Sequence, residues 1–105
     1  MPVITKCHKN LHAILQEMGF QVVDEYTVLD YSIDCYVSEV NLGFEADGKL
    51  YHWKTRDTIR DAKILEASGI KILRLPESEL NAVKQHCELR RRIVEFMVEN
   101  CINGY

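Results

Sequence analysis

Two short segments with strand-like alternation constrain the fold of this chain more than any other feature. In YSIDCYV (31–37) and LGFEAD (42–47), apolar side chains alternate with polar or small ones, as in strands that bury one face. The four residues between the segments have the length of a hairpin loop. The pattern therefore predicts an antiparallel β-hairpin in which Asp34 lies directly opposite Glu45.

The loop length also predicts the register of this hairpin. The expected pairs are Val37–Leu42, Tyr36–Gly43, Cys35–Phe44, Asp34–Glu45 and Ser32–Asp47. A shift by one residue would move every side chain to the opposite face, so an apolar face determines the register strongly. The members of that face, which we expect to pack on the core, are Ile33, Cys35, Val37, Phe44 and Ala46.

The other face of the predicted hairpin carries three carboxylates, those of Asp34, Glu45 and Asp47. Like charges that face each other across a sheet repel, and no Lys or Arg partner is expected on this face. A divalent cation would neutralise the cluster, and carboxylate oxygens suit Mg²⁺ or Mn²⁺ better than Zn²⁺. The alternative is a solvated sheet face, on which acidic side chains are common.

His52 follows Asp47 by five residues, which is close enough to overhang the same site. A neutral imidazole is the side chain best suited to transfer protons near pH 7. By itself, however, a histidine in a Tyr-His-Trp run is more often packed or at the surface. The role of His52 therefore depends on whether the acidic cluster holds a metal ion.

The remaining sequence predicts a single domain, residues 1–105, in which helices alternate with strands. The expected elements are a helix at 5–18, strands at 20–28, 31–37 and 42–47, a helix at 55–68, a strand at 70–75 and a long final helix from 77 or 78. Residues 51–53 are interpreted either as a further strand or as the fraying end of the previous one. A chain of 105 residues is long enough for one modest core.

Apolar spacing indicates which helix faces are buried. The first helix has one apolar face, formed by Leu11, Ile14, Leu15 and Met18. The helix at 55–68 follows helical spacing imperfectly, through Ile59, Ala62 and Leu65. The final helix is expected to bury a stripe of Leu80, Val83, Cys87, Val94, Met97 and Cys101. Beside that stripe lie Ile93, Phe96 and Met97, either as core or as a second apolar surface for a homodimer.

Composition excludes several classes of protein. The chain is 47% apolar and 28% charged, which excludes a disordered or fibrous chain. No apolar run approaches the roughly 20 residues of a membrane helix, and the N-terminus lacks the apolar core of a signal peptide. We expect a soluble cytoplasmic protein without membrane contact. Its four cysteines form no C-x-x-C pair and are expected to be free, mostly buried thiols.

The net charge of −3 argues mildly against nucleic-acid binding, but basic residues are locally concentrated. Candidate phosphate contacts are Lys49, Lys54, Arg56, Arg60 and Lys63. In the second helix, Arg56 and Arg60 share one face, as do Asp57 and Asp61. This pattern alone favours a salt-bridged solvent face. Beside a metal site, the arginines would suit phosphate and the aspartates would suit His52.

The run S-I-D-C-Y … L-G-F-E-A-D-G-K-L-Y-H … R-D-x-x-R-D-A-x-x-L-E-x-x-G-I-K-I-L-R-L-P-E resembles the Vsr-like nucleases of the PD-(D/E)XK endonuclease superfamily. It is most similar to the catalytic domains of phage homing endonucleases of the EDxHD type, and the RAP domain shares the same outline. The resemblance extends from about Thr5 to Glu79. It implies an α/β (α+β) fold with a restriction-endonuclease-like αβββαβ core, a mixed central sheet and a C-terminal helix.

The resemblance also implies roles for individual residues. Asp34 matches the metal-binding aspartate, while Glu45 and Asp47 occupy the (D/E)XK positions, with Asp47 where a Lys usually stands. By the same resemblance, the carbonyl of Ala46 would be a second metal ligand. His52 matches the catalytic histidine. The late acid of the motif is matched by Asp61 or, as a second choice, by Asp57.

The sequence departs from the family pattern in three respects. The motif lysine is missing, so that proton transfer would fall to His52, as base on a water or acid on the leaving 3′ oxygen. His8 stands at the position in the first helix where the family has a glutamate. Glu17 lies on the next face of the same helix. The Cys/His zinc ligands of bacterial mismatch nucleases are not evident. The role of the first helix is therefore open between His8 and Glu17.

The activity implied by the resemblance is metal-dependent hydrolysis of phosphodiester bonds in double-stranded DNA, with Mg²⁺ or Mn²⁺ as cofactor. The chain would be the catalytic domain of a homing endonuclease, acting in a phage-infected or bacterial cell, with a DNA-targeting domain elsewhere in a longer protein. A RAP-like module that binds nucleic acid or takes part in RNA processing, without DNA cleavage, is the alternative. A third hypothesis is that the chain is a protein-interaction domain.

Overall fold

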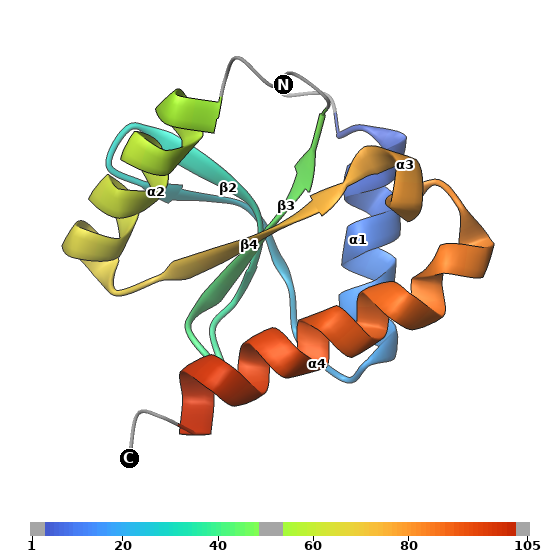
Figure 1. Ribbon diagram of the computed structural model, residues 1–105. Helices are drawn as coiled ribbons and strands as arrows, with labels where there is room; N and C mark the ends of the chain where they lie inside the picture. The colour runs from blue at the N-terminus through green and yellow to red at the C-terminus, as the bar shows by residue number, and fades with distance from the viewer. Residues whose placement is uncertain (1–3, 49–53, 103–105) are drawn as a thin grey trace.

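The computed structural model describes residues 4–48 and 54–102. Its centre is a four-stranded mixed sheet with the strand order β1-β2-β3-β4 (Figure 1). The strands are β1 (Val23–Val28), β2 (Tyr31–Val37), β3 (Leu42–Asp47) and β4 (Lys71–Pro76). β2 pairs antiparallel with both β1 and β3, whereas β4 runs parallel to β3. The expected αβββαβ order and mixed sheet are therefore confirmed.

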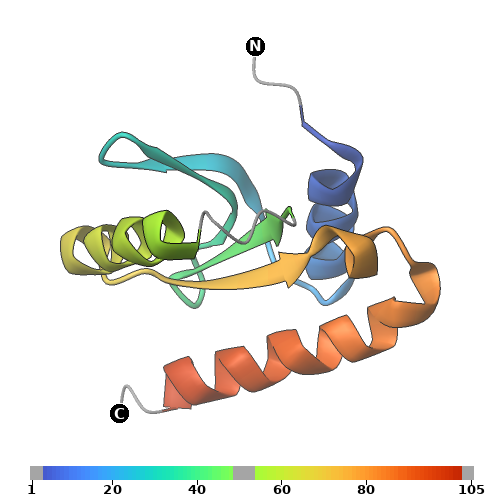
Figure 2. The same ribbon diagram turned by 45° about the horizontal axis from the view of Figure 1, so that its top comes forward.

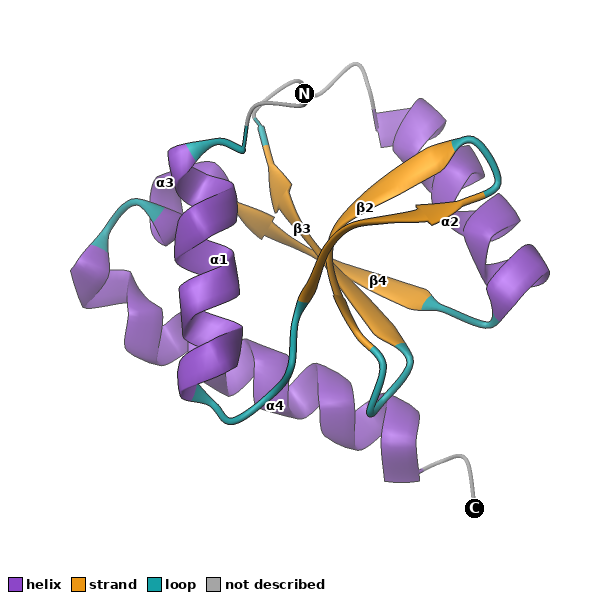
Figure 3. Ribbon diagram, turned by 180° about the vertical axis from the view of Figure 1, so that it is seen from behind, coloured by secondary structure: helices purple, strands orange, loops and turns teal. Residues whose placement is uncertain are grey.

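Helices cover both faces of the sheet. On one side lies α2 (Lys54–Ser68), and on the other lie α1 (Lys6–Glu17) and α4 (His86–Ile102) (Figure 3). After β4 the chain passes through the short helix α3 (Glu77–Leu80) and the 3₁₀ turn η2 (Val83–Gln85) before turning back as α4 (Figure 2). None of the helices in the described part of the chain is long and apolar enough to cross a membrane.

The start and end of α1 follow from local sequence. The side-chain oxygen of Thr5 accepts a hydrogen bond from the backbone N–H of His8 at 3.2 Å, as an N-cap residue does. Gly19 follows the helix with a φ of +96°, a conformation that glycine adopts without steric cost. Leu11 and Leu15 are fully buried, as the spacing of apolar residues predicts. These constraints fix the position of His8 relative to the sheet.

The sheet has a hydrophobic core on each side. The larger core, on the side of α1 and α4, includes Leu11, Phe44, Leu75 and Ile93. The smaller core lies beneath α2 and consists of Val28, Ile33, Tyr36, Ile64 and Ile70. The second face of the sheet is therefore covered by a helix and is not an open, solvated face.

The predicted hairpin register is confirmed for Val37–Leu42, Tyr36–Gly43 and Cys35–Phe44. Within the described residues, the β2–β3 pairing ends there, so the expected pairs Asp34–Glu45 and Ser32–Asp47 do not form. Beyond this point, β2 remains paired with β1, and β3 continues beside β4 as far as Asp47. The two strands of the hairpin thus part at the position of the predicted acidic cluster.

The expectation that Ile33 shares the face of Cys35 is wrong. Ile33 belongs to the core beneath α2, whereas Cys35 belongs to the core beside α1. Between the pairs Asp24–Cys35 and Tyr26–Ile33, β1 contains Glu25 with a φ of +52°, so the strands are locally distorted there. Simple alternation along β2 is therefore interrupted at Asp34.

Two predicted helix faces are only partly correct. The final helix is not continuous from residue 77, because Ala82 has extended backbone angles between α3 and η2. Leu80 and Met97 of the expected stripe are buried, but Val83 is 80% exposed, and Cys87 and Val94 are also exposed. Leu89 and Ile93 are buried in their place.

In α2, the expected apolar residues Ile59 and Leu65 are exposed, and Ile64 is buried instead. Much of the inward face of α2 is polar, which explains why its apolar spacing looks imperfect in the sequence. The burial of Ile93 and Met97 assigns them to the core and not to an exposed dimer surface.

Candidate functional site

The carboxylate of Asp34 lies where β2 and β3 part. Its Oδ2 accepts a hydrogen bond from the backbone N–H of Ala46 at 3.0 Å. Burial raises the pKa of Asp34, and Glu25 adds to this effect, whereas the Ala46 hydrogen bond, His8 and Arg60 act in the opposite direction. No Lys or Arg within residues 4–48 and 55–100 forms an ion pair with Asp34. This carboxylate is desolvated, and no described Lys or Arg side chain pairs with it directly.

His8 brings α1 to this position. Its side chain is 4% exposed, with Nδ1 at 3.6 Å from Glu25 Oε1 and Nε2 at 2.9 Å from Asp24 Oδ1. One ligand atom each from His8, Glu25 and Asp34 lie within 4.8 Å of one another. Glu17, the other residue considered for the first helix, is exposed. The structure therefore brings His8, and not Glu17, beside Asp34.

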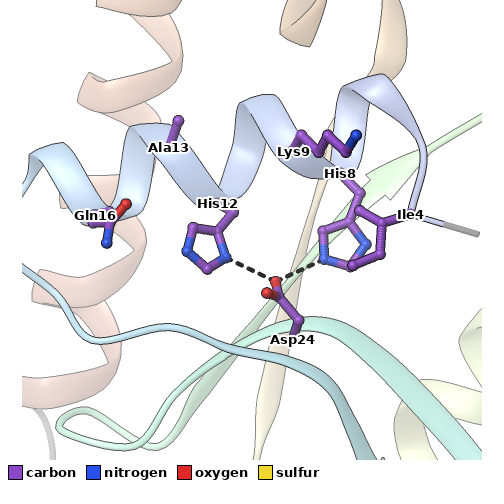
Figure 4. A pocket seen from close by; sticks show the side chains of 7 residues that line it. All are labelled: Ile4, His8, Lys9, His12, Ala13, Gln16 and Asp24. Carbon is purple, nitrogen blue, oxygen red and sulfur yellow. Dashed lines mark hydrogen bonds and ion pairs between the residues drawn. The ribbon is translucent and has the colours of Figure 1, made fainter.

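A second group of polar side chains adjoins His8. Figure 4 shows His8 and His12 of α1 both directed at Asp24 of β1. His12 Nδ1 lies 2.8 Å from Asp24 Oδ1, the same oxygen that His8 contacts. Burial alone would raise the pKa of Asp24, but the hydrogen bonds from His12 and His8 lower it overall. These three residues line a pocket of about 210 Å³ together with Lys9 and others.

Glu45 has a different environment beneath α2. It is 7% exposed, and its Oε2 accepts a hydrogen bond from Arg60 Nη2 at 2.6 Å. Arg74 Nη1 lies 3.6 Å from its other oxygen. Burial raises the pKa of Glu45 to about 7, outweighing the attraction of Arg60 and Arg74 for the charged form. Arg60 also donates to the backbone carbonyl of Ser32 at 2.6 Å, which ties α2 to β2.

The same network includes Asp61, the predicted late acid. Arg74 donates to both of its oxygens, from Nη2 at 2.8 Å and from Nε at 3.2 Å, and Arg60 Nη1 lies 3.3 Å away. Asp57 is 3.7 Å from Arg74. Burial would lower the pKa of Arg74, but Asp61, Glu45 and Asp57 raise it overall. The carboxylates under α2 are therefore held by arginines.

Sequence reasoning missed Arg74, and its omission explains one wrong expectation. The acidic face was expected to lack a Lys or Arg partner, but in the parallel register of β3 and β4, Arg74 stands beside Glu45. The sequence does contain a signal for this role: Arg74 is the single arginine among the apolar residues that end the predicted strand IKILRLP. A charged residue in such a strand needs partners of opposite charge, and Asp61 and Glu45 are those partners.

Asp47 is partly buried at the end of β3. Burial raises its pKa, as do Asp57, Glu77 and Asp61, while Arg74 acts in the opposite direction. In the described part of the chain, Asp47 does not belong to either group of three potential ligands within 4.8 Å; these are His8–Asp24–Cys35 and His8–Glu25–Asp34. Among the described residues, Asp34 and Asp47 therefore share no group of three potential ligands.

The basic residues predicted to contact phosphate fall into different settings. Arg60 points inward and is committed to Glu45 and Ser32. Arg56 and Lys63 are exposed on α2. Lys54 begins that helix. The predicted catalytic residue His52 and the predicted phosphate contact Lys49 lie outside the described residues.

The fold is similar to that of one solved structure, the catalytic domain of the homing endonuclease I-Bth0305I. The two structures superpose with a TM-score of 0.70 at 20% sequence identity, over 91% of this chain and 97% of that domain. At this identity the likeness establishes the fold, and function must be inferred from the site. No family model matches the sequence, and no curated protein matches it.

Proposed function

We propose that this chain is a metal-dependent endonuclease domain that hydrolyses phosphodiester bonds in double-stranded DNA. The observation that carries the proposal is Asp34, a desolvated carboxylate held by the Ala46 N–H and without a Lys or Arg ion pair among the described residues. The fold shared with a homing endonuclease catalytic domain supports it. The motif further suggests a Vsr-like member of the PD-(D/E)XK superfamily and a homing function.

The residues present fit a hard divalent cation. Asp34, Asp47 and the carbonyl of Ala46 offer oxygen ligands of the kind that Mg²⁺ or Mn²⁺ prefers. An ion would also neutralise Asp34, which burial otherwise penalises. When bound, a divalent ion stabilises charge on the phosphate and acidifies a water molecule. Glu45 is not needed for this role, because Arg60 and Arg74 already balance its charge.

The chain itself would orient the reactants and move the proton. Asp34 is positioned by Ala46, whose amide fixes the carboxylate between β2 and β3. Asp61 and Arg74 hold α2 against β3 and β4 and so define one wall of the site. We assign the proton transfer to His52, as base or acid, because no motif lysine is present.

Basic side chains in and before α2 would hold the DNA backbone. Arg56 and Lys63 on α2, together with Lys49 and Lys54, are the candidates, since phosphate contacts give affinity without sequence selection. Arg60 is assigned instead to Glu45, its partner in the structure. We further propose that residues 1–105 act as one catalytic domain in the cytoplasm of a phage-infected or bacterial cell, and that a separate segment selects the target.

The proposal is tested by nicking of supercoiled plasmid with Mg²⁺, with Mn²⁺ and with EDTA. We expect cutting that requires the metal and is lost in Asp34→Ala and His52→Ala. Asp30→Ala, at an exposed position in the turn after β1, is the matched control and should cut normally. Cutting that persists in EDTA, or in Asp34→Ala, would overturn the metal site.

A RAP-like binding module makes a different prediction in the same experiment. It would bind nucleic acid without metal and equally in wild type and both variants, with no cleavage under any condition. Binding should be measured on double-stranded DNA and single-stranded RNA of the same sequence. That combination of results would replace the nuclease assignment by a non-catalytic one.

A further inference from the structure

A group of nitrogen, sulfur and oxygen ligands adjoins the pocket that His8, His12 and Asp24 line, and the proposed reaction does not use it. It consists of His8 and His12 on α1, Asp24 on β1 and Cys35 on β2. His8 and His12 are four residues apart in one helix, so both imidazoles project from the same side toward Asp24 (Figure 4). This spacing on a helix is one that metal-binding histidine pairs use.

The distances in this group approach those of a coordination sphere. His8 Nε2 lies 2.9 Å and Cys35 Sγ lies 3.8 Å from Asp24 Oδ1. One ligand atom each of His8, Asp24 and Cys35 lie within 4.8 Å of one another. In a tetrahedral zinc site, bonds of about 2.0–2.3 Å place the ligand atoms roughly 3.3–3.8 Å apart. Small side-chain movements would therefore suffice to place all three around one ion.

We propose that His8, Asp24 and Cys35, with His12 as fourth ligand, bind a zinc-class divalent cation that fastens α1 to β1 and β2. Thiolate and imidazole ligands select Zn²⁺ or Co²⁺ over Mg²⁺. His8 and Cys35 are buried, at 3% and 0% exposure, while His12 and Asp24 line the pocket through which an ion would enter. Lys9 also lines this pocket, and its cationic side chain must remain clear of the ion.

Binding of the ion involves one proton. The Cys35 thiol loses its hydrogen to solvent as the sulfur–metal bond forms, and no oxidant or reductant takes part. The site differs in chemistry from the hard oxygen site proposed at Asp34, although His8 lies between the two groups. It does not rest on the nuclease assignment, because a structural ion would fasten α1 whether or not the chain cuts DNA.

The test is a Co²⁺ titration of the metal-free protein in the presence of excess Mg²⁺. We expect one equivalent of Co²⁺ to give the near-ultraviolet charge-transfer band of a cobalt–thiolate bond and the intense visible bands of tetrahedral Co²⁺. The thiolate band should disappear in Cys35→Ala and persist in Cys87→Ala, whose thiol is exposed. It should also persist in Asp34→Asn, which separates this site from the proposed nuclease site.

A second variant guards against misfolding of Cys35→Ala, because Cys35 is fully buried. His12 is only partly buried, and His12→Gln should weaken Co²⁺ binding at least about tenfold while the thiolate band survives at saturation. The inference is overturned if no thiolate band forms in wild type. It is also overturned if the band survives in Cys35→Ala, since another of the four thiols would then be the ligand.

Discussion

Asp34 and Glu45 are expected to face each other in the hairpin, yet the structure gives them opposite surroundings. Glu45 is buried beneath α2 with Arg60 at 2.6 Å and Arg74 at 3.6 Å. Asp34 has only the Ala46 N–H and the neighbourhood of His8, and forms no Lys or Arg ion pair in the part of the chain described. Burial raises the pKa of both groups. This difference is the basis for our proposal that Glu45 stabilises the fold and that Asp34 binds the metal ion.

The cause of this difference is the direction of the neighbouring strands. β3 has β4 as its parallel neighbour, which places Arg74 beside Glu45. β2 has β1 as its neighbour, which places the acidic residues Asp24 and Glu25 near Asp34. One partner strand therefore brings positive charge and the other negative charge.

Removing Arg74 should have the largest effect on stability. Arg74→Met removes one of the two cations that Glu45 and Asp61 share and leaves only Arg60 beside them, and loss of one partner of a buried pair costs about 3–5 kcal/mol. Because 20% of the Arg74 side chain is exposed, we expect the lower end of that range. Urea unfolding in EDTA measures the change. Arg91→Met, in an exposed ion pair of α4, should leave the free energy of unfolding unchanged.

An equal, small effect of Arg74→Met and Arg91→Met would contradict the structural role of the network under α2. It would mean that water reaches Glu45 and Asp61 as readily as it reaches the surface of α4. The contrast between Asp34 and Glu45 would then disappear.

The pH dependence of stability tests Glu45 directly. Its pKa is about 7 in the folded protein against 4.5 in the unfolded chain, so the folded state holds the proton more tightly. The stabilisation is fully present below pH 4.5 and is lost as the pH rises to 7, in total about 3 kcal/mol. Glu45→Gln should remove this loss, as measured by unfolding in EDTA across the same pH range.

The opposite result would also be informative. If wild type and Glu45→Gln have parallel stability profiles between pH 4.5 and 7, Arg60 and Arg74 keep Glu45 ionised throughout. The expected dominance of burial over the two arginines would then be wrong.

A smaller effect is expected from filling the space at Gly43. A Cβ there would lie 2.9 Å from Ile33 Cγ2 and 3.3 Å from Ile72 Cγ1, both in the core beneath α2. Gly43→Ala should reduce the free energy of unfolding by about 1–3 kcal/mol through overpacking. In Gly48→Ala the nearest atom belongs to the flexible side chain of Glu77, so its cost should be smaller in the same unfolding assay. Equal costs would mean that the core beneath α2 is loosely packed.

The smallest effect on stability is expected at Asp34. Asparagine retains an oxygen for the Ala46 N–H and removes a desolvated charge, so Asp34→Asn should change the free energy of unfolding by about 1 kcal/mol or less, in the stabilising direction above pH 7. Asp30→Asn in the exposed turn is the control for the charge change itself. A loss comparable to that of Arg74→Met would give Asp34 the same structural role as Glu45.

Local patterns in the sequence predict much of this fold. The hairpin register follows from alternation and loop length, and its three observed pairs match. The cap at Thr5 and the stop at Gly19 follow from residue chemistry. These features depend on contacts between residues close in sequence, so a linear pattern contains the necessary information.

The charges beneath α2 could not be predicted in the same way. Arg74 meets Glu45 only because β4 returns parallel to β3 in one particular register, which a crossover helix sets and no local pattern reveals. The break at Ala82 likewise changes which face of α4 is buried, although no proline or glycine stands there. The sequence places His8 at the first-helix position of the motif, but its contacts with Asp24 and Glu25 depend on how α1 packs against β1.

Asp34 is proposed to bind the metal ion and Glu45 to stabilise the fold. The most direct test of these two roles is Mn²⁺ binding to wild type, Asp34→Asn and Glu45→Gln, measured by calorimetry at one pH. The predicted result is binding that is weakened at least about tenfold in Asp34→Asn and is nearly unchanged in Glu45→Gln. Binding that survives in Asp34→Asn but is lost in Glu45→Gln would contradict the account, because the ion would then be held by the residue assigned to the fold.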